Sequence, residues 1–324
     1  MSRKEQISII VASFNKGKFI EETVRSVLNQ TSKDWELIIV DDASEDNTSL
    51  ILNKYADNPQ IKILFQKVNQ GANVCRNLGI SKATGKFLMF LDADDLLAID
   101  CIERRLRVLS EYHNKHLWVF SMGVFKLEIG DDQRIWEPRF KFPLEDFLAH
   151  NLPWSIMQPV WQTKFITELG GFDVNFFRLQ DVELHTRACL VNGIDIHLQV
   201  DKPDCFYRID EERLNFDYTK FISRWIQGAL MYCEKFAGLV TVKQKRLLRL
   251  TLMAACLPLV LGFRDGKIDS LHYKRNILEL QLGLRKLDGS ISLLLIFRLF
   301  VFYNQYLPRI PGVNFILRKL IVAL

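Results

Sequence analysis

Three carboxylates follow directly after an apolar run near residue 90. Residues 87–91 are Phe, Leu, Met, Phe and Leu, and Asp92, Asp94 and Asp95 come immediately behind them. Asp92 and Asp94 stand two residues apart, so on an extended backbone both side chains point the same way. Such a pair can bind Mg²⁺ or Mn²⁺, whose other positions go to water and substrate phosphates. The spacing predicts a metal-bound diphosphate, with helix capping by these aspartates as the alternative.

The elements that would position these acids alternate along the chain. The apolar run is typical of a parallel strand covered on both faces, and ligands of open α/β sheets bind beyond the carboxyl ends of such strands. Runs of β-branched residues at 7–12 and 36–40, joined by an amphipathic segment at 19–30, predict a right-handed βαβ unit. A doubly wound α/β sheet follows if the next segments are helix, strand and helix, as we expect for residues 47–55, 61–65 and 72–83.

Beyond the acids the pattern continues less regularly. We expect helices at residues 101–112, 144–150, 164–169 and 181–191, and extended segments at 117–127, 134–140 and 154–163. For Trp154 and Trp161 we expect core packing, with support of a sugar ring as the alternative. Glu183 and His185 are expected on the exposed side of their helix.

Composition indicates a globular protein inside the cell. The chain has 324 residues, 48% hydrophobic and 25% charged, which is enough for one large domain and a smaller appendage. Its six cysteines form no CxxC pair, so we expect reduced and mostly buried thiols in the cytosol. The first residues run straight into a short strand and lack the apolar stretch of a secretory signal.

The last part of the chain differs in character from the rest. Residues 216–324 carry 17 Lys and Arg against 6 Asp and Glu, whereas residues 1–215 have a net charge of −6. A basic and apolar extension favours peripheral contact with anionic lipid on the cytoplasmic face of a membrane. We expect no nucleic-acid partner, because nothing else in the sequence indicates one. The apolar segments 250–263 and 291–306 are too short or interrupted for a transmembrane span, which leaves interfacial helices or a packed helical subdomain.

Five segments in register carry a resemblance to a known family. The chain is similar to the family 2 glycosyltransferases over residues 5–215. The resemblance implies a GT-A fold, a doubly wound mixed sheet flanked by helices, followed here by a helical extension at 216–324. The segments that carry it are residues 8–15, 30–31 with 36–44, 71–80, 91–95, and 170–173 with 180–184.

The resemblance also implies a reaction and its acids. Inverting glycosyl transfer needs a cation, Mn²⁺ or Mg²⁺, to neutralise the departing nucleotide diphosphate, and a carboxylate to accept the proton of the acceptor hydroxyl. Asp94 is the expected metal ligand, with Asp92 sharing that role or touching the ribose and Asp95 in support. Asp181 is the expected base, although the family usually shows Glu-Asp where this chain has Gln180-Asp181. The alternative for Asp181 is that it only opens a helix.

The donor would be a nucleotide sugar, with a UDP-sugar expected. One of Asp41 and Asp42 would bind uracil or ribose, while Ser44 and Asp46 are expected to form the turn after that strand. Arg76 suits a base or a phosphate, with a plain surface arginine as the alternative. The full set of residues expected to bind the donor is Ala12, Ser13, Asn15, Asp41, Asp42, Arg76, Asp92 and Ala93.

The acceptor implied by the resemblance is a hydroxyl of a lipid-linked or growing cell-surface glycan. A nucleotidyltransferase also uses paired aspartates, but the sequence has neither G-x-G-x-x-G nor G-x-x-x-x-G-K-[ST], so no Gly-rich phosphate loop is indicated. A binding or scaffold protein with a degenerate transferase fold would have lost the metal acids or the base, and Asp94 and Asp181 are both present.

Overall fold

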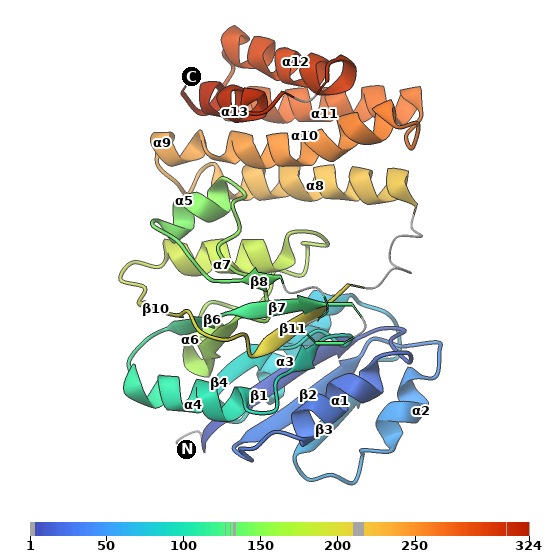
Figure 1. Ribbon diagram of the computed structural model, residues 1–324, viewed down its shortest axis with the longest axis vertical. Helices are drawn as coiled ribbons and strands as arrows, with labels where there is room; N and C mark the ends of the chain where they lie inside the picture. Colours follow the sequence, from blue (N-terminus) through green and yellow to red (C-terminus); the bar gives the residue numbers. More distant parts are fainter. Residues whose placement is uncertain are drawn as a thin grey trace. The chain divides into compact units, whose positions relative to one another are not determined.

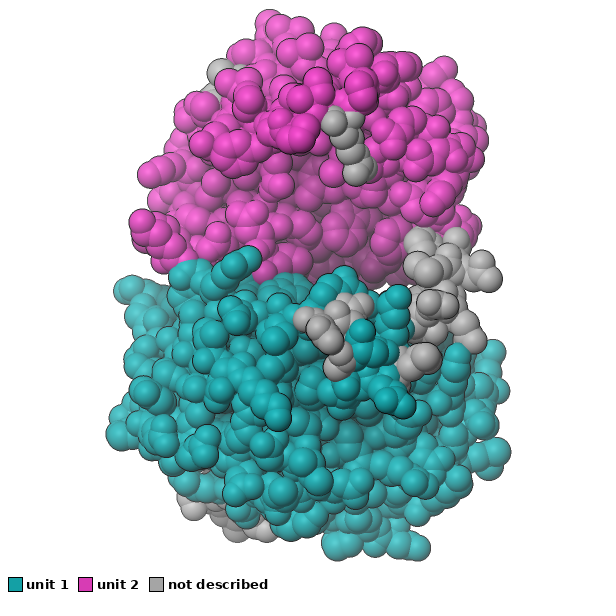
Figure 2. All heavy atoms as spheres, in the orientation of Figure 1, with its two compact units in different colours: residues 1–140, 153–175, 187–211 teal, residues 141–152, 176–186, 212–324 magenta. Residues whose placement is uncertain are grey.

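The chain divides into two compact units. The structure is a computed structural model that describes residues 4–126, 128–129, 131, 134–209, 217–308 and 310–323. Figure 2 colours the two units separately. The predicted boundary between residues 215 and 216 lies outside the described residues. The first unit holds residues 1–140, 153–175 and 187–211, and the second holds 141–152, 176–186 and 212–324.

Among the described residues, the first unit is built on a seven-stranded mixed sheet of order β10-β6-β9-β4-β1-β2-β3 (Figure 1). β9 runs antiparallel to both of its neighbours, β4 and β6, and the other pairs are parallel. The mixed sheet is confirmed, and so are the strands predicted at residues 7–12, 36–40, 61–65 and 87–91, whereas only residues 159–162 of the segment predicted at 154–163 form a strand. The strands are β1 (Lys4–Ser13), β2 (Trp35–Asp41), β3 (Ile61–Phe65), β4 (Gly85–Phe90), β6 (Leu117–Phe120), β9 (Pro159–Gln162) and β10 (Ile196–Gln199).

The order of the strands creates a switch point between β1 and β4. Ile9 is in register with Leu37 of β2 on one side and with Met89 of β4 on the other. The chain runs outward from β1 through β2 to β3 and then returns across the sheet to β4. Where the winding reverses, the connections leave neighbouring strands in opposite directions and open a crevice at their carboxyl ends. Residues that follow β1 and β4 therefore meet at a favoured ligand site.

Helices cover both faces of this sheet. Right-handed crossovers place α1 and α2 on one face, and α3, which follows the reversal, on the other. α6 packs with α3, and both contact the sheet. Residues of the central strands, such as Ile9, Ile38 and Leu88, are fully buried between the two layers of helices. The helices are α1 (Ile20–Leu28), α2 (Thr48–Asn53), α3 (Ala72–Lys82), α4 (Cys101–Glu111) and α6 (Thr163–Glu168).

A smaller sheet of order β5-β11-β7-β8 completes the first unit. The extended segment predicted at 117–127 breaks at Ser121, so that β6 belongs to the large sheet and β7 to the small one. The segment predicted at 134–140 is a strand only at its start. These strands are β5 (Leu96–Leu97), β7 (Met122–Phe125), β8 (Ile135–Trp136) and β11 (Cys205–Arg208).

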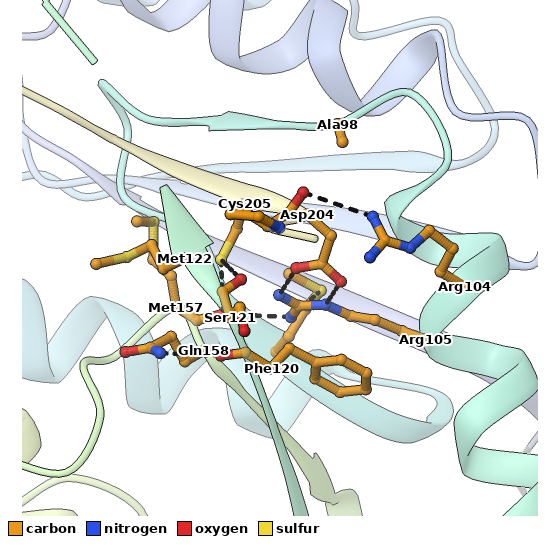
Figure 3. A network of polar contacts seen from close by, with 12 residues as sticks. Ala98, Arg104, Arg105, Phe120, Ser121, Met122, Met157, Gln158, Asp204 and Cys205 are labelled. Atoms are coloured by element: carbon orange, nitrogen blue, oxygen red, sulfur yellow. Dashed lines mark hydrogen bonds and ion pairs between the residues drawn. The ribbon is translucent and has the colours of Figure 1, made fainter. Parts of the chain in front are cut away.

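A buried ion pair joins α4 to the residue before β11 (Figure 3). Arg105 Nε and Nη2 donate to the two carboxylate oxygens of Asp204 at 2.9 and 2.6 Å, and both side chains are at most 2% exposed. Arg105 also donates to the carbonyl of Met157 at 3.2 Å and lies over the ring of Phe120. Because Asp204 O accepts the N–H of Ala98, this network anchors the segment that runs from the acids into β5.

The second unit is helical. α10 contacts α8, α11, α12 and α13, and its residues from Leu248 to Val260 supply much of the core. Arg249 of α10 is buried, pairs with Asp288 and donates to the carbonyl of Ile321 at 2.7 Å. The helices are α5 (Pro143–Leu148), the start of α7 (Gln180–Leu190), α8 (Tyr218–Phe236), α9 (Val242–Lys245), α10 (Leu248–Arg264), α11 (Ser270–Leu287), α12 (Ile291–Tyr306) and α13 (Val313–Ala323).

Two predictions for α7 are wrong. Glu183 is fully buried, and its Oε1 accepts a hydrogen bond from Lys235 Nζ at 2.6 Å. His185 is 1% exposed and lies against the ring of Phe147. The sequence suggested a surface because both residues are polar, but α7 begins among helices of the second unit. Burial of Trp154 and Trp161, at 1% and 0% exposed, confirms their predicted core packing.

One helical stretch is longer than its apolar run indicated. By length and composition, Val242–Arg264 could cross a membrane, and 56% of its most apolar window is buried inside the fold. The apolar run of the sequence covers only residues 250–263, because the basic residues before it interrupt the apolar pattern. A core helix has the same composition, so this helix is weak support for a span.

Candidate active site

The three acids lie just beyond β4, and α1 fixes their backbone. Leu91 N–H donates to the carbonyl of Ile10 at 3.0 Å, which extends the pairing with β1 beyond the strand. The buried hydroxyl of Thr23, on α1, lies 3.1 Å from the carbonyl oxygen of Ala93 and 2.9 Å from that of Asp95. The segment that carries Asp94 is therefore held against α1.

Arg208, at the end of β11, holds the same segment from the other side. Its backbone N–H donates to Asp95 Oδ1 at 2.8 Å, and its Nε donates to the carbonyl of Asp94 at 2.8 Å. The guanidinium lies over the rings of Phe19 and Phe125. Arg208 is not among the predicted site residues, and no local signal could have identified it, because it follows the acids by more than 110 residues.

Each of the two predicted metal ligands faces a basic side chain. Lys16 Nζ lies 2.6 Å from Asp94 Oδ2, and Arg76 Nη2 lies 3.1 Å from Asp92 Oδ1. The Asp94 side chain is 2% exposed, whereas that of Asp92 is 34% exposed. Asp92 is thus the more accessible carboxylate, and Asp94 the more dependent on a nearby positive charge.

Arg76 is a buried residue of the site and not a surface arginine. It is 8% exposed, on α3, and its guanidinium lies 5.3 Å from the ring centre of Phe172. Phe172 in turn meets Phe90, the last residue of β4, edge to face at 5.0 Å. The arginine is therefore placed between an aromatic ring and Asp92, which fixes the direction of its charge.

The loops after β1 and β2 are bound to each other. Asn15 N–H donates to Ser44 Oγ at 2.9 Å, and Asn15 Oδ1 accepts the N–H of Glu45 at 2.8 Å. Asn15 and Ala43 have φ angles of 51° and 60°, which are uncommon for residues other than glycine. Such backbone strain persists only where its surroundings impose it, and it gathers at ligand sites.

The two acids at the end of β2 stabilise neighbouring backbone. Asp41 accepts the N–H and hydroxyl of Ser44 at 3.0 and 2.5 Å, which confirms the predicted turn. Asp42 accepts the N–H groups of Gln70 and Gly71, at 2.8 and 2.7 Å, at the start of α3. Both are at most 3% exposed.

The remaining predicted donor residues lie on β1, next to these acids. Ser13 is 2% exposed and Ala12 is half-buried. The hydroxyl of Ser13 has no hydrogen-bond partner among the described residues. The carboxyl ends of β1, β2 and β4 thus bring together all the residues predicted to bind the donor, except Arg76, which reaches this edge from α3.

The acids fit a divalent cation that takes part of its ligands from a substrate. In the described part of the chain, no group of three His, Cys, Asp or Glu side chains is arranged to hold a metal by itself. Asp95 Oδ2 is nevertheless buried without a hydrogen-bond partner among the described residues. Burial, together with the negative charge of Asp92, raises the pKa of Asp95 well above its usual range. An additional cation beside Asp92 and Asp94 would offset the negative charge of these buried carboxylates.

Asp181, the predicted base, lies in the second unit. It is half-buried in the first turn of α7, which begins at Gln180. Leu179, just before this helix, has a φ of 55° and is 8% exposed. A leucine in the left-handed region is a genuine outlier, so the entry to α7 is held in a strained conformation.

Comparison with solved structures identifies the fold. The crystal structure of S. aureus TarS 1–349 in complex with UDP-GlcNAc superposes with a TM-score of 0.67 at 19% identity, covering 93% of this chain and 89% of that one. The mixed sheet, with acids beyond its central strands and helices on both faces, is a GT-A fold. Residues 8–163 match the family model of glycosyl transferase family 2, and this part of the chain is a domain of that family.

Relatives of this domain include named bacterial enzymes. The chain is 40% identical over 109 residues to the putative teichuronic acid biosynthesis glycosyltransferase TuaG of Bacillus subtilis, covering 33% of this chain and 43% of the relative. It is 36% identical over 103 residues to the UDP-Glc:alpha-D-GlcNAc-diphosphoundecaprenol beta-1,3-glucosyltransferase WfgD of Escherichia coli, covering 32% of this chain and 40% of the relative. The chain thus spans less than half the length of these relatives.

Proposed function

We propose that this protein is an inverting glycosyltransferase that moves a sugar from a nucleotide-diphosphate donor to a hydroxyl of a glycan. The observation that carries the proposal is the position of Asp92 and Asp94. They lie beyond β4, beside the switch point with β1, within a glycosyl transferase family 2 domain. This is where an open α/β sheet binds its ligand, and paired carboxylates suit a cation that carries phosphates.

The donor is expected to be a UDP-sugar. Ala12, Ser13 and Asn15 would line the base pocket, and one of Asp41 and Asp42 would contact uracil or ribose. The strained loops at Asn15 and Ala43 support a ligand site at this edge. TarS, which has a similar fold, was crystallised with UDP-GlcNAc.

The chemistry divides between charge neutralisation and proton transfer. Mn²⁺ or Mg²⁺ at Asp92 and Asp94 would supply positive charge for the departing nucleotide diphosphate. Arg76, held against Asp92 by Phe172, adds a fixed positive charge on the same side. Asp181 accepts the proton of the acceptor hydroxyl while the oxygen of that hydroxyl attacks the anomeric carbon of the donor sugar. The strained entry to α7 at Leu179 supports a functional role for this turn.

The acceptor is proposed to be a lipid-linked or growing cell-surface glycan. The support comes from relatives: the name of WfgD specifies a diphosphoundecaprenol-linked acceptor, and that of TuaG specifies teichuronic acid biosynthesis. An acceptor that is anchored in lipid requires the enzyme to work at a membrane surface.

Calorimetric titration with UDP and GDP, with and without Mn²⁺, tests the donor site. We expect Mn²⁺-dependent binding of UDP, weakened at least about tenfold by Asp94→Asn because a metal ligand loses its charge. Asp181→Asn should bind UDP like the wild type and lose turnover by about 10²- to 10⁴-fold. Metal-dependent binding of GDP but not of UDP would indicate a GDP-sugar as the donor. An absence of nucleotide binding would contradict the proposed function.

A helical face in the second unit supports peripheral contact with anionic lipid through residues 216–324. The exposed apolar residues of α12 form one stripe, opposite its buried face at Leu293, Phe297 and Phe300. Basic residues lie on the same helix and on its neighbours α11 and α13, among them Arg298, Lys286 and Lys319. Apolar and basic groups together match a bilayer with anionic head groups. The stripe is Ile291, Leu295, Leu299, Phe302 and Tyr306, each at least 53% exposed.

Point variants test this contact better than truncation. Thr251 donates to the carbonyl of Leu148, and Lys235 pairs with buried Glu183, so removal of residues 216–324 would expose groups elsewhere in the unit. Leu295→Gln with Leu299→Gln should reduce co-sedimentation with phosphatidylglycerol vesicles. Leu50→Gln, an exposed leucine of α2, is the matched control. Equal binding by the wild type, the double variant and Leu50→Gln would contradict the contact. If the wild type bound phosphatidylcholine vesicles as well as phosphatidylglycerol vesicles, the preference for anionic lipid would be wrong.

A further inference from the structure

A lysine and an aspartate form an ion pair across the switch point. Lys16 follows β1 and Asp94 follows β4, and these two strands flank the point where the winding of the sheet reverses. Their side chains meet at 2.6 Å between Nζ and Oδ2. The pair therefore spans the position at which an open α/β sheet receives its ligand.

The backbone that carries Lys16 is fixed. Lys16 N–H donates to Thr48 Oγ1 and Gly17 N–H donates to Asp46 Oδ2, both at 2.9 Å. A Cβ at position 17 would lie 1.7 Å from Asn47 Oδ1, so a larger residue there would have to displace the Asn47 side chain at the start of α2. Because the main chain is locked, the ammonium group can leave Asp94 only by rotation of the lysine side chain.

The burial of Asp94 explains why it needs such a partner. Its side chain is 2% exposed, so its carboxylate has lost most of its hydration and depends on nearby positive charge. Lys16 is 27% exposed and retains access to solvent. A divalent cation at Asp94 would meet the ammonium group at short range, and the two positive charges would repel each other. The lysine and the metal therefore compete for one carboxylate.

We propose that Lys16 neutralises Asp94 in the donor-free protein and releases it when a divalent cation arrives with the nucleotide diphosphate. The ammonium group then turns toward the phosphates, which offer it an alternative anion. This inference rests on the proposed function, since it assumes a diphosphate donor at this edge. Its consequence is an order of events: metal alone binds weakly, and metal and nucleotide bind with positive coupling.

The test measures binding of Mn²⁺ by electron paramagnetic resonance, which needs no turnover. Lys16→Gln should bind Mn²⁺ alone at least about tenfold more tightly than the wild type, because the competing charge is gone. The same variant should bind UDP more weakly in the absence of metal. Lys18→Gln removes an equal charge two residues away on an exposed side chain and should match the wild type. Lys16→Arg keeps the charge and should restore weak binding of Mn²⁺ alone.

The outcomes separate this inference from the proposed function. If the wild type binds UDP with Mn²⁺ but Lys16→Gln binds Mn²⁺ alone no more tightly, the competition is wrong and the donor site stands. If Lys18→Gln tightens Mn²⁺ as much as Lys16→Gln does, the effect is one of net charge and the inference also fails. If the wild type binds neither UDP nor Mn²⁺, both proposals fail. Circular dichroism of each variant verifies that it is folded.

Discussion

Asn77 and Phe172 are joined by two reciprocal hydrogen bonds. The side-chain amide of Asn77 donates to the carbonyl of Phe172, and its Oδ1 accepts the N–H of Phe172, both at 2.8 Å. One turn earlier on α3, Asn73 donates to the carbonyl of Asp173 at 2.8 Å. The helix that carries Arg76 is thereby fixed to the segment whose aromatic ring supports that arginine.

Replacement of Asn77 should destabilise the first unit. Asn77→Ala leaves the backbone N–H and carbonyl of Phe172, a residue 2% exposed, without their partners. We expect the free energy of unfolding to fall by roughly 2 kcal/mol or more, measured by urea denaturation. Asn77→Asp keeps the acceptor for the N–H of Phe172 and loses the donor to its carbonyl. Its stability should therefore lie between that of the alanine variant and that of the wild type. An alanine variant as stable as the wild type would contradict this role.

The buried pair of Arg105 and Asp204 should be costly to break and cheaper to replace. Asp204→Ala leaves an uncompensated charge at a side chain that is fully buried, and should cost about 3–5 kcal/mol of stability. The double variant Arg105→Met with Asp204→Leu removes both charges and should lose less than Asp204→Ala alone. Chemical denaturation of Arg105→Met, Asp204→Leu and the double variant measures the coupling. Additive losses would show that the two side chains act independently.

Acid should destabilise the protein through His185. Burial lowers the pKa of His185 to about 3, whereas the unfolded chain takes up a proton near pH 6.5. The unfolded state therefore gains a proton first, and stability falls by about 1.4 kcal/mol per pH unit as the pH drops below 6.5. His185→Gln should flatten the dependence of the urea midpoint on pH between 7 and 5. The exposed His113, changed to Gln, is the control and should leave the slope unchanged.

Thiol reactivity should report the burial of the cysteines. Burial, aided by Asp42, raises the pKa of Cys75 to about 12, and burial raises that of Cys205 to about 12. Cys189 is the one cysteine of the six that is partly exposed. At pH 8 a disulfide reagent should modify about one thiol in the native protein and all six in urea. Cys189→Ser should abolish the native reaction, and rapid modification of a second thiol would contradict the fold around the others.

Local patterns predicted the parts of the site that depend on short stretches of chain. The apolar run before Asp92 identified β4, and the β-branched runs identified β1 and β2, because a buried parallel strand needs such residues wherever it stands. Ser44 and Asp46 were expected in a turn and form one. The position of the acids beyond β4 follows from the same reasoning.

Partners from distant parts of the chain could not be predicted. Lys16 meets Asp94 across 78 residues and Arg208 meets it across 114, and no local pattern relates these positions. Glu183 and His185 are expected on the surface because polar residues usually lie there, but helices distant in the sequence meet them: Phe147 of α5 lies against His185, and Lys235 of α8 pairs with Glu183. The charge of Glu183 is matched by Lys235, a contact that only the folded chain creates.

The carboxylate of Asp42 has a consequence for how a nucleoside would be received. Its two oxygens already accept the N–H groups of Gln70 and Gly71, so its orientation is set when the chain folds. A ribose hydroxyl that donates to this carboxylate would meet a rigid receptor, with little side-chain entropy left to lose on binding. Affinity at this edge would then depend on the shape of the nucleoside more than on any adjustment by the protein.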